Sequence, residues 1–429
     1  MGMGSASPEL ATPQEGAPTG GRPARLDSVD LVRGLVMVIM ALDHVRDYFS
    51  DRLFLDPVDL KSTTPGIFFT RWITHYCAPV FIFLAGTGAF LSGTRGKSKG
   101  ELAWFLLSRG LWLLLLELTV IKMSWAFHFD LYVHGGGVFW AIGWSMIVLA
   151  GLVFLPLSAI AVFGGLLVCC HNAFDGKTAE QLGLPSLLWL ILHSPGELPV
   201  VGSVKFGTAY CLIPWAGVMA LGYCLGALLR LEPVTRRREL FGLGGALILA
   251  FIFLRWINLY GDALPWDTKQ EGIFALCSFL NCTKYPPSLL YLLMTLGPAI
   301  VAVAALEKVT GPVARFFITF GRVPLFFYLL HIPLIHGLAV AVDIARWGWS
   351  PLATNGPWVM FFDPRNVEGA GGFGQQILFF IWTGFLPGYG FSLPIVYLIW
   401  VGVVLLLYLP CRWFAGVKQR NRAAWLSYL

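Results

Sequence analysis

The first apolar stretch of the chain holds the residues whose types and spacing best suit acid–base chemistry. His44 is followed three residues later by Asp47, which a helix would put about one turn further along the same face. A carboxylate beside an imidazole orients the ring and stabilises its cation, which is the usual arrangement of a general base. The pair could therefore remove a proton from an attacking hydroxyl or amine.

A second polar pair, Asp30 and Arg33, lies near the start of the same stretch, with the spacing of an ion pair on one helical face. Helical geometry puts Arg33 on nearly the same face as His44, about 16 Å away along the axis. Charged residues within a bilayer usually face the protein interior and mark function. An ion pair that only anchors helix packing would also explain Asp30 and Arg33.

Other apolar stretches could bring ionisable partners to the two ends of this stripe. His75 and Lys284 are expected near the end that carries the imidazole, and Arg315 and Arg322 near the end that carries the arginine. His331 lies deep in an apolar run, where an imidazole without a partner is costly, so it is a further candidate for the site.

The remaining polar and sulfur-containing side chains favour structural interpretations. His171 and His193 are expected in loops, and no Cys or His spacing typical of a metal site is present, so no metal is expected. Most of the eight cysteines are expected to be small buried apolar residues, although Cys277 and Cys282 could pair in one polar loop. The chain lacks a P-loop, a GxSxG elbow and an HExxH motif, which argues against the enzyme classes that these motifs mark.

The amino-acid composition of the chain indicates a membrane protein. The chain is 57% hydrophobic and only 13% charged, whereas soluble domains carry roughly 25% charged residues. We expect an all-α polytopic integral membrane helix bundle of about ten transmembrane helices, each about 20 residues long. The predicted spans lie near 29–49, 67–91, 102–126, 136–155, 157–174, 208–230, 240–258, 287–306, 315–340 and 391–413. The net charge of +6 comes without a basic stripe interleaved with aromatic residues, so nucleic acid is not an expected partner.

Three regions follow from these spans. Residues 1–24 read as a disordered cytoplasmic tail without a signal peptide, residues 25–415 as the membrane domain, and residues 416–429 as a cytoplasmic C-terminal tail. Short segments rich in Lys and Arg put both termini in the cytoplasm. The long outer segments 175–207 and 341–390 either cap a substrate cleft or connect helices without order. The lipid bilayer is the expected partner, and a homo-oligomer is compatible with the sequence.

Three stretches then resemble a known family. They are Arg25-Leu-Asp-Ser-Val-Asp30-Leu-Val-Arg33-Gly34 continuing to His44, the stretch from His75 to Gly86, and Lys284-Tyr-Pro-Pro-Ser-Leu-Leu together with the stretch from Gly321 to His331. In this order they resemble the bacterial membrane proteins related to the catalytic part of heparan-α-glucosaminide N-acetyltransferase. The resemblance implies a bundle of ten or eleven helices in the bacterial inner membrane. It also implies transfer of an acetyl group from cytoplasmic acetyl-CoA to an acceptor on the far side.

The resemblance implies that His44 is the catalytic base, and the positions of the other candidate residues suggest their roles. His44, oriented by Asp47, would deprotonate a sugar-like hydroxyl or amine, with His75, Lys284 and His331 completing the catalytic site. The acyl-CoA would be bound near Arg25, Asp30, Arg33, Arg315 and Arg322. The segment 50–70, where the lysosomal enzyme of animals carries its catalytic His, contains no His in this chain. Direct transfer is therefore favoured over a covalent acetyl-His intermediate.

Two other classes of function would fit the same helices. In a proton- or ion-coupled transporter or flippase, the buried Asp, Arg and His residues would form the coupling site. A non-catalytic scaffold would explain the spans but not the shared face of Arg33, His44 and Asp47. The predicted acyltransferase is preferred because no pair of unwound helices of the transporter type is evident in the sequence.

Overall fold

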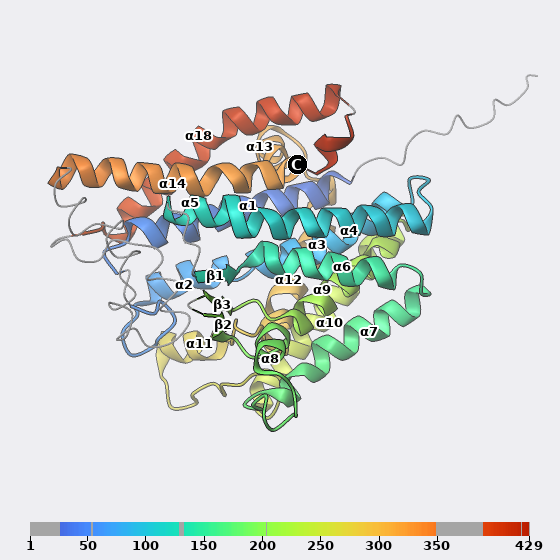
Figure 1. Cartoon of the computed structure of the whole chain (residues 1–429), viewed down its shortest axis with the longest axis horizontal. Helices are drawn as coiled ribbons and strands as arrows, with labels where there is room; N and C mark the ends of the chain where they lie inside the picture. The colour runs from blue at the N-terminus through green and yellow to red at the C-terminus, as the bar shows by residue number, and fades with distance from the viewer. Residues whose placement is uncertain are drawn as a thin grey trace, which may run out of the picture.

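The computed structural model describes residues 26–52, 55–127, 133–202, 204–348, 389–421 and 423–428 of the chain. Within these ranges the protein is a bundle of helices with one small sheet (Figure 1), which confirms the predicted all-α membrane fold class. The α-helices are α1 Asp27–Phe49, α2 Pro65–Thr74, α3 Cys77–Gly93, α4 Lys99–Leu116, α5 Lys122–Ala126, α6 Val138–Leu152, α7 Leu157–Cys170, α8 Ser186–Leu192, α9 Leu212–Leu228, α10 Pro233–Ile257, α11 Gly272–Leu280, α12 Leu289–Ala305, α13 Pro312–Arg322, α14 Pro324–Trp347 and α18 Leu393–Arg420. Shorter turns are a π-helical turn at Glu117–Ile121 and 3-10 turns at His171–Phe174, Leu306–Lys308 and Ala424–Ser427.

Seven of the described helical stretches are long and apolar enough to cross a bilayer: Pro65–Gly93, Lys99–Trp125, Leu157–Phe174, Pro233–Ile257, Leu289–Lys308, Pro324–Trp347 and Leu393–Arg420. The shorter helices α6 and α9 are also apolar. Helix α1 has 23 residues, a length of about 35 Å, but contains several charged side chains. The total of ten spans therefore stays a prediction.

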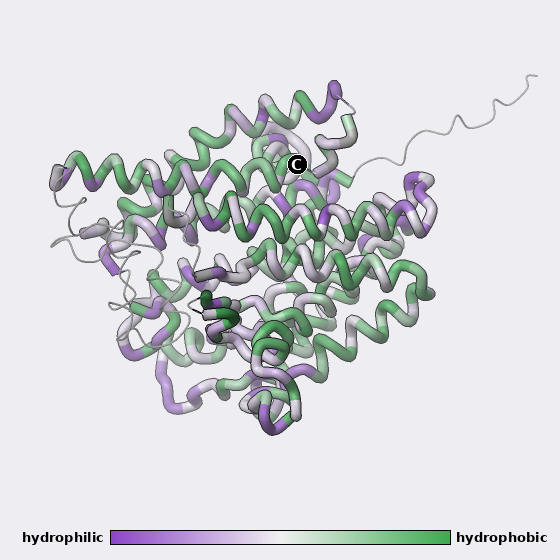
Figure 2. Tube along the Cα trace, in the orientation of Figure 1, coloured by the Kyte–Doolittle hydropathy of each residue, from purple (hydrophilic) through white to green (hydrophobic). Residues whose placement is uncertain are grey.

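Apolar residues line most of the helices (Figure 2), and their exposure separates the bundle interior from its periphery. In the apolar stretch of the span that contains α12, 67% of the residues are buried, whereas in the corresponding stretches of α10 and α18 only 22% are buried. The side chains of Leu249 and Phe253 on α10 are 68% and 64% exposed. Because large apolar side chains in such numbers are costly in water, these two helices are expected to face lipid.

The break between α13 and α14 corrects one predicted span. The sequence predicts a single helix near 315–340, but α13 ends at Arg322 and α14 begins at Pro324. Proline has no backbone N–H to donate and disfavours the helical conformation of the residue before it. Val323 accordingly has a φ of −131° and a ψ of 50°.

A three-stranded sheet, with the strand order β1-β3-β2, connects segments far apart in the sequence. Strand β1, Val133–Gly136, pairs parallel with β3, Val204–Thr208, and β3 pairs antiparallel with β2, Gly196–Val201. The Thr208 hydroxyl also donates to the Gly136 carbonyl at 2.8 Å. Since β1 precedes α6 and β3 precedes α9, the sheet ties together the starts of these two helices.

Two predicted connections contain regular structure. The segment 175–207 contains α8, β2 and most of β3, so it is not a structureless connector where it is described. The segment before α12 contains α11, in which Cys277 is buried, and both Cys277 and Cys282 are free thiols. Much of the second long segment, 349–388, lies outside the described residues.

Candidate functional site

Helix α1 carries both predicted polar pairs and lies inside the bundle, with α14 and α18 on one side and α3 and α12 on the other (Figure 1). Of its 23 residues, 17 are buried. Because other helices shield α1 from lipid, its charged side chains can be balanced by protein partners. The polar stripe therefore faces protein, as an internal site requires.

At the N-terminal end of α1, Arg33 forms the expected ion pair with Asp30, with 3.1 Å between Nη1 and Oδ1. Arg33 Nη1 also donates to the carbonyl of Gly321 at 3.3 Å, and Nη2 to that of Leu84 at 3.5 Å. The guanidinium thus connects α1 to α13 and α3. These contacts agree with the structural interpretation of the Asp30–Arg33 pair.

The same end contains a very close helix crossing. A Cβ atom added at Gly34 would lie 1.8 Å from the Phe317 carbonyl oxygen, and one at Gly321 would lie 1.8 Å from the Asp30 carbonyl oxygen. Only glycine permits two backbones to approach this closely. The glycine after Arg33 in the sequence motif therefore has a packing role at the crossing of α1 and α13.

The other predicted donor-binding cations differ in their surroundings. Arg322 Nη2 lies 3.1 Å from Asp27 Oδ1, and Arg322 Nε lies 4.0 Å from Asp30 Oδ2, so Arg322 joins the cluster. Arg315 is exposed on α13, about two turns before Arg322. Arg25 lies outside the described residues.

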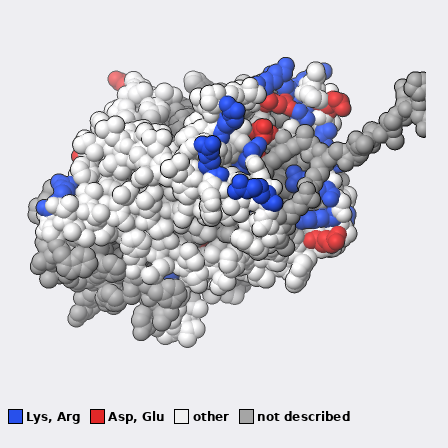
Figure 3. Space-filling view, turned by 90° about the horizontal axis from the view of Figure 1, so that it is seen from above, with Lys and Arg blue, Asp and Glu red and all other residues white. Residues whose placement is uncertain are grey.

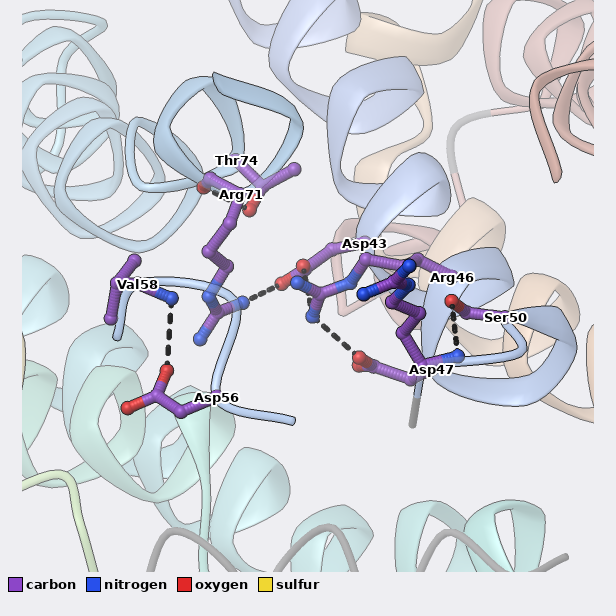
Figure 4. A network of polar contacts seen from close by, with 9 residues as sticks. Asp43, Arg46, Asp47, Ser50, Asp56, Val58, Arg71 and Thr74 are labelled. Carbon is purple, nitrogen blue, oxygen red and sulfur yellow. Dashed lines mark hydrogen bonds and ion pairs between the residues drawn. The ribbon is translucent and has the colours of Figure 1, made fainter. Parts of the chain in front are cut away.

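The opposite end of α1 carries a network of charged residues (Figure 4). Asp43 accepts from Arg71 on α2 and from Arg46, with 3.0 Å between Asp43 Oδ1 and Arg46 Nη2. Arg46 Nη2 also lies 2.6 Å from Asp47 Oδ1. Two cations and two carboxylates are thus alternately paired, which offsets the cost of removing them from water.

Within this network the carboxylate of Asp47 has a partner other than His44. The sequence predicts that Asp47 orients His44, but its carboxylate is paired with Arg46 instead. Among the described residues, no hydrogen bond joins Asp47 to the His44 ring, and His44 Nδ1 is buried without a hydrogen-bonding partner. A neighbouring guanidinium competes for the carboxylate with a charge-assisted bond, which is stronger than one from a neutral imidazole.

His44 packs instead against aromatic and imidazole rings. Its ring centroid lies 4.8 Å from that of Trp125, 5.0 Å from that of His331 and 6.4 Å from that of Tyr328. The His44 and His331 rings meet edge to face, with 84° between their planes. The structure therefore brings together two of the predicted catalytic residues, from α1 and α14.

The hydrogen bonding of His331 indicates its tautomer. Nδ1 lies 2.6 Å from the carbonyl oxygen of Tyr328, and because a carbonyl can only accept, Nδ1 must carry the hydrogen. In a neutral ring Nε2 then has a free lone pair, and this buried atom has no hydrogen-bonding partner in the described part of the chain. His331 can therefore accept a hydrogen bond or a proton at Nε2.

Lys284 and His75 lie close to the charged network. The charge of Lys284 acts on Asp43, His44 and His75, so these four residues are close in space. His75 is buried, and its Nδ1 has no partner among the described residues, while its carbonyl accepts from the Tyr291 hydroxyl at 2.7 Å. The region around His44 thus contains cations and imidazole nitrogens that have no hydrogen-bonding partner in the described part of the chain.

Tyr285, beside Lys284, extends this polar region. Its phenol forms side-chain hydrogen bonds with Tyr210 and Lys284. Burial opposes ionisation of the phenol, but the cations of Lys284 and Arg71 outweigh it and lower the pKa of Tyr285. The loop before α12 thus supplies an amine and a phenol next to each other.

The sequence pattern does not predict several residues of this site. Trp125 and Tyr328 contact His44, yet their residue types are common in apolar helices and carry no chemical signal. Tyr328 precedes His331 by three residues, so a helical projection puts both on one face. The ion pair of Asp43 with Arg71 joins two helices and therefore leaves no pattern in the linear sequence.

We predict that Asp43→Asn lowers the free energy of unfolding by about 2 kcal/mol, because it leaves the buried Arg71 without its anion. The loss stays below that of an isolated buried pair because Asp47 still balances Arg46. Adding Arg71→Gln should recover part of the loss, as measured by denaturation in detergent. Asp56→Asn, at an exposed carboxylate of the adjoining loop, is the matched control. Strictly additive effects in the double variant would contradict the ion-pair coupling.

The comparisons with known proteins agree with this picture. A search of the curated proteins found no match to the chain. The sequence pattern of the family described as heparan-alpha-glucosaminide N-acetyltransferase, catalytic, matches residues 25–256. This match covers more than half of the chain and includes α1 and α2, which carry the Asp30–Arg33 pair and the network of Asp43, Arg46, Asp47 and Arg71. The chain therefore belongs to the heparan-alpha-glucosaminide N-acetyltransferase catalytic family.

Proposed function

We propose that the protein transfers an acetyl group from acyl-CoA, bound at the N-terminal end of α1, to a sugar-like hydroxyl or amine at the opposite end. Membership of a transmembrane acetyltransferase family supports the reaction class. The observation that carries the proposal is the burial of α1, with a cation–carboxylate cluster at one end and uncommitted imidazoles at the other. Arg33 and His44 are about 16 Å apart along the helix axis, a separation that the pantetheine arm of acyl-CoA could bridge.

The distribution of basic residues supports an orientation for this reaction. Lys and Arg side chains gather at the end of the molecule where α1 begins and α18 ends (Figure 3). Basic segments next to membrane spans favour the cytoplasmic side. In this proposal both termini are cytoplasmic, the membrane is the bacterial inner membrane, and acetyl-CoA reaches the basic end from the cytosol.

The donor contacts proposed from the sequence need one revision. Arg33 and Asp30 hold α1 against α13, so they shape the donor site rather than bind the phosphates. Arg322 and Arg315 have exposed surface on α13 and can pair with phosphate oxygens. Arg25 precedes α1 and is proposed as a further phosphate ligand.

The reaction can be written as direct transfer. His44 accepts the proton of the acceptor hydroxyl or amine as the acceptor atom forms a bond to the carbonyl carbon of the thioester. Lys284 and His75 stabilise the negative charge on the carbonyl oxygen. The carbon–sulfur bond then breaks, and the CoA sulfur leaves with the electron pair and takes up the proton. Asp47 acts through Arg46, which it holds in place, and His331 supports the His44 ring.

The direct test uses protein reconstituted into liposomes that enclose a sugar such as glucosamine, with acetyl-labelled acetyl-CoA added outside. Molecules whose basic end faces outward are expected to label the enclosed sugar, because donor and acceptor meet across the bilayer. Protein-free liposomes are the control. Uptake of the sugar without acetylation would contradict the proposal and favour the transporter. Labelling of sugar only on the side of the acetyl-CoA would contradict the proposed direction.

A further inference from the structure

Three side chains away from α1 form a compact group of metal-ligating type. His171 begins the 3-10 turn that follows α7, Asp175 comes directly after this turn, and His193 follows α8. One ligand atom from each lies within 4.8 Å of the others. His171 and His193 are 1% and 3% exposed, so a metal ion here would be held mainly by protein.

The distances suit a tetrahedral metal ion. His171 Nδ1 lies 3.2 Å from His193 Nε2, and His193 Nε2 lies 3.7 Å from Asp175 Oδ1. Two nitrogens each about 2.0–2.1 Å from Zn²⁺, at the tetrahedral angle, are about 3.3 Å apart. The distance between the two imidazole nitrogens therefore already suits two ligands of one ion, and the distance from His193 Nε2 to the carboxylate oxygen is slightly longer than this value.

A neighbouring amide orients the carboxylate of this group. Asn172 Nδ2 donates to Asp175 Oδ2 at 2.8 Å, which leaves Oδ1 directed to the histidines. Such an outer contact to a ligating carboxylate is typical of metal sites in proteins. His171 Nε2 is buried and has no hydrogen-bonding partner in the described part of the chain.

We propose that His171, Asp175 and His193 form a Zn²⁺ site, with a fourth position open to water. Two imidazoles and one carboxylate are ligands that Zn²⁺ accepts in proteins. The side chain of Asp175 is 20% exposed, which gives a cation a route from solvent. The two histidines are 22 residues apart in the sequence, a spacing that matches none of the short metal-binding motifs.

The ion would support the loop that precedes α12. Asn172 Oδ1 accepts from the Leu289 N–H at 2.8 Å, and Pro287 forms an isolated bridge with Lys284. A metal that fixes the turn at His171–Phe174 would therefore steady Lys284 and Tyr285 through these contacts. The role is structural, and it does not depend on which acceptor the enzyme uses.

The test starts with the whole chain in detergent, purified without a histidine tag and stripped with a chelator. Titration with Zn²⁺ is expected to give one ion per chain and to raise the apparent unfolding temperature. Co²⁺ is expected to give the visible absorption of a four- or five-coordinate site, and Zn²⁺ should remove that absorption. A folded, stripped chain that binds no stoichiometric Zn²⁺ would overturn the proposal.

Variants then locate the ion. Asp175→Asn keeps the shape of the side chain, and we expect Zn²⁺ affinity to fall at least about tenfold, while His193→Gln should lower it at least about a hundredfold. His134→Gln, in β1 and outside the group, should leave the affinity unchanged. Should His193→Gln fail to fold, the Asp175→Asn titration and the Co²⁺ spectrum still decide. Unchanged affinity in both cluster variants would show that the ion binds elsewhere and that the proposal is wrong.

Discussion

His44→Gln is expected to lower the rate of acetyl transfer at saturating acetyl-CoA by about a thousandfold, within the range typical of a lost general base. Glutamine is similar in length to histidine and polar, but it cannot take up a proton at neutral pH. The surrounding rings of Trp125 and His331 should still pack, so the unfolding temperature should change little. The measurement is the turnover of labelled acetyl-CoA by purified protein with a defined sugar.

The structure makes His331→Gln the necessary companion, because His331 has its own uncommitted nitrogen at Nε2. If His44 is the base, loss of His331 should slow transfer only about tenfold to a hundredfold through the position of the His44 ring. His336→Gln is the matched control, since this buried histidine of α14 is already bonded at Nδ1 to the Ser124 carbonyl at 3.2 Å. A larger loss in His331→Gln than in His44→Gln would transfer the role of base to His331.

The contrast between His44 and Asp47 shows what a linear pattern can establish. The three-residue spacing places both side chains on one face of a helix, and both lie in α1. It could not show that Arg46 would take the carboxylate, because the choice depends on Arg71 and Asp43 from two different helices. Contacts within a helix follow from periodicity, whereas competition between helices depends on tertiary packing.

The secondary-structure elements also differ in how well the sequence predicts them. Long apolar runs predict α10, α12 and α18 well, since about 20 apolar residues have few stable alternatives to a membrane helix. The sheet of β1, β2 and β3 was not predicted, because its strands are four to six residues long and lie in Gly-rich connections. Strands this short carry too few alternating positions for a reliable pattern.

The second large effect is expected at the crossing of α1 and α13. Gly34→Ala should lower the free energy of unfolding by about 3 kcal/mol, at the upper end of the usual cost of overpacking. The new methyl group would lie 1.8 Å from the Phe317 carbonyl oxygen, so the helices must separate. Thermal unfolding in detergent, followed by tryptophan fluorescence, measures the loss.

Gly321→Ala should cost a similar amount, because its Cβ meets the Asp30 carbonyl oxygen at the same distance from the other helix. Gly242→Ala is the matched control: this glycine lies within α10 with no atom within 4 Å of an added Cβ. There the change should stabilise the helix slightly. Equal unfolding temperatures for all three variants would contradict the close crossing.

The crossing also connects stability to the proposed reaction. Arg33 donates to the Gly321 carbonyl and to Asp30, so separation of α1 from α13 would stretch both contacts and displace Arg322 from Asp27. A Gly34→Ala protein that remains folded should therefore bind acetyl-CoA more weakly while keeping the His44 site intact. The expected signature is a raised KM for acetyl-CoA with a nearly unchanged kcat, the reverse of the effect expected for His44→Gln. A lowered kcat at unchanged KM would instead indicate that the two ends of α1 are not independent.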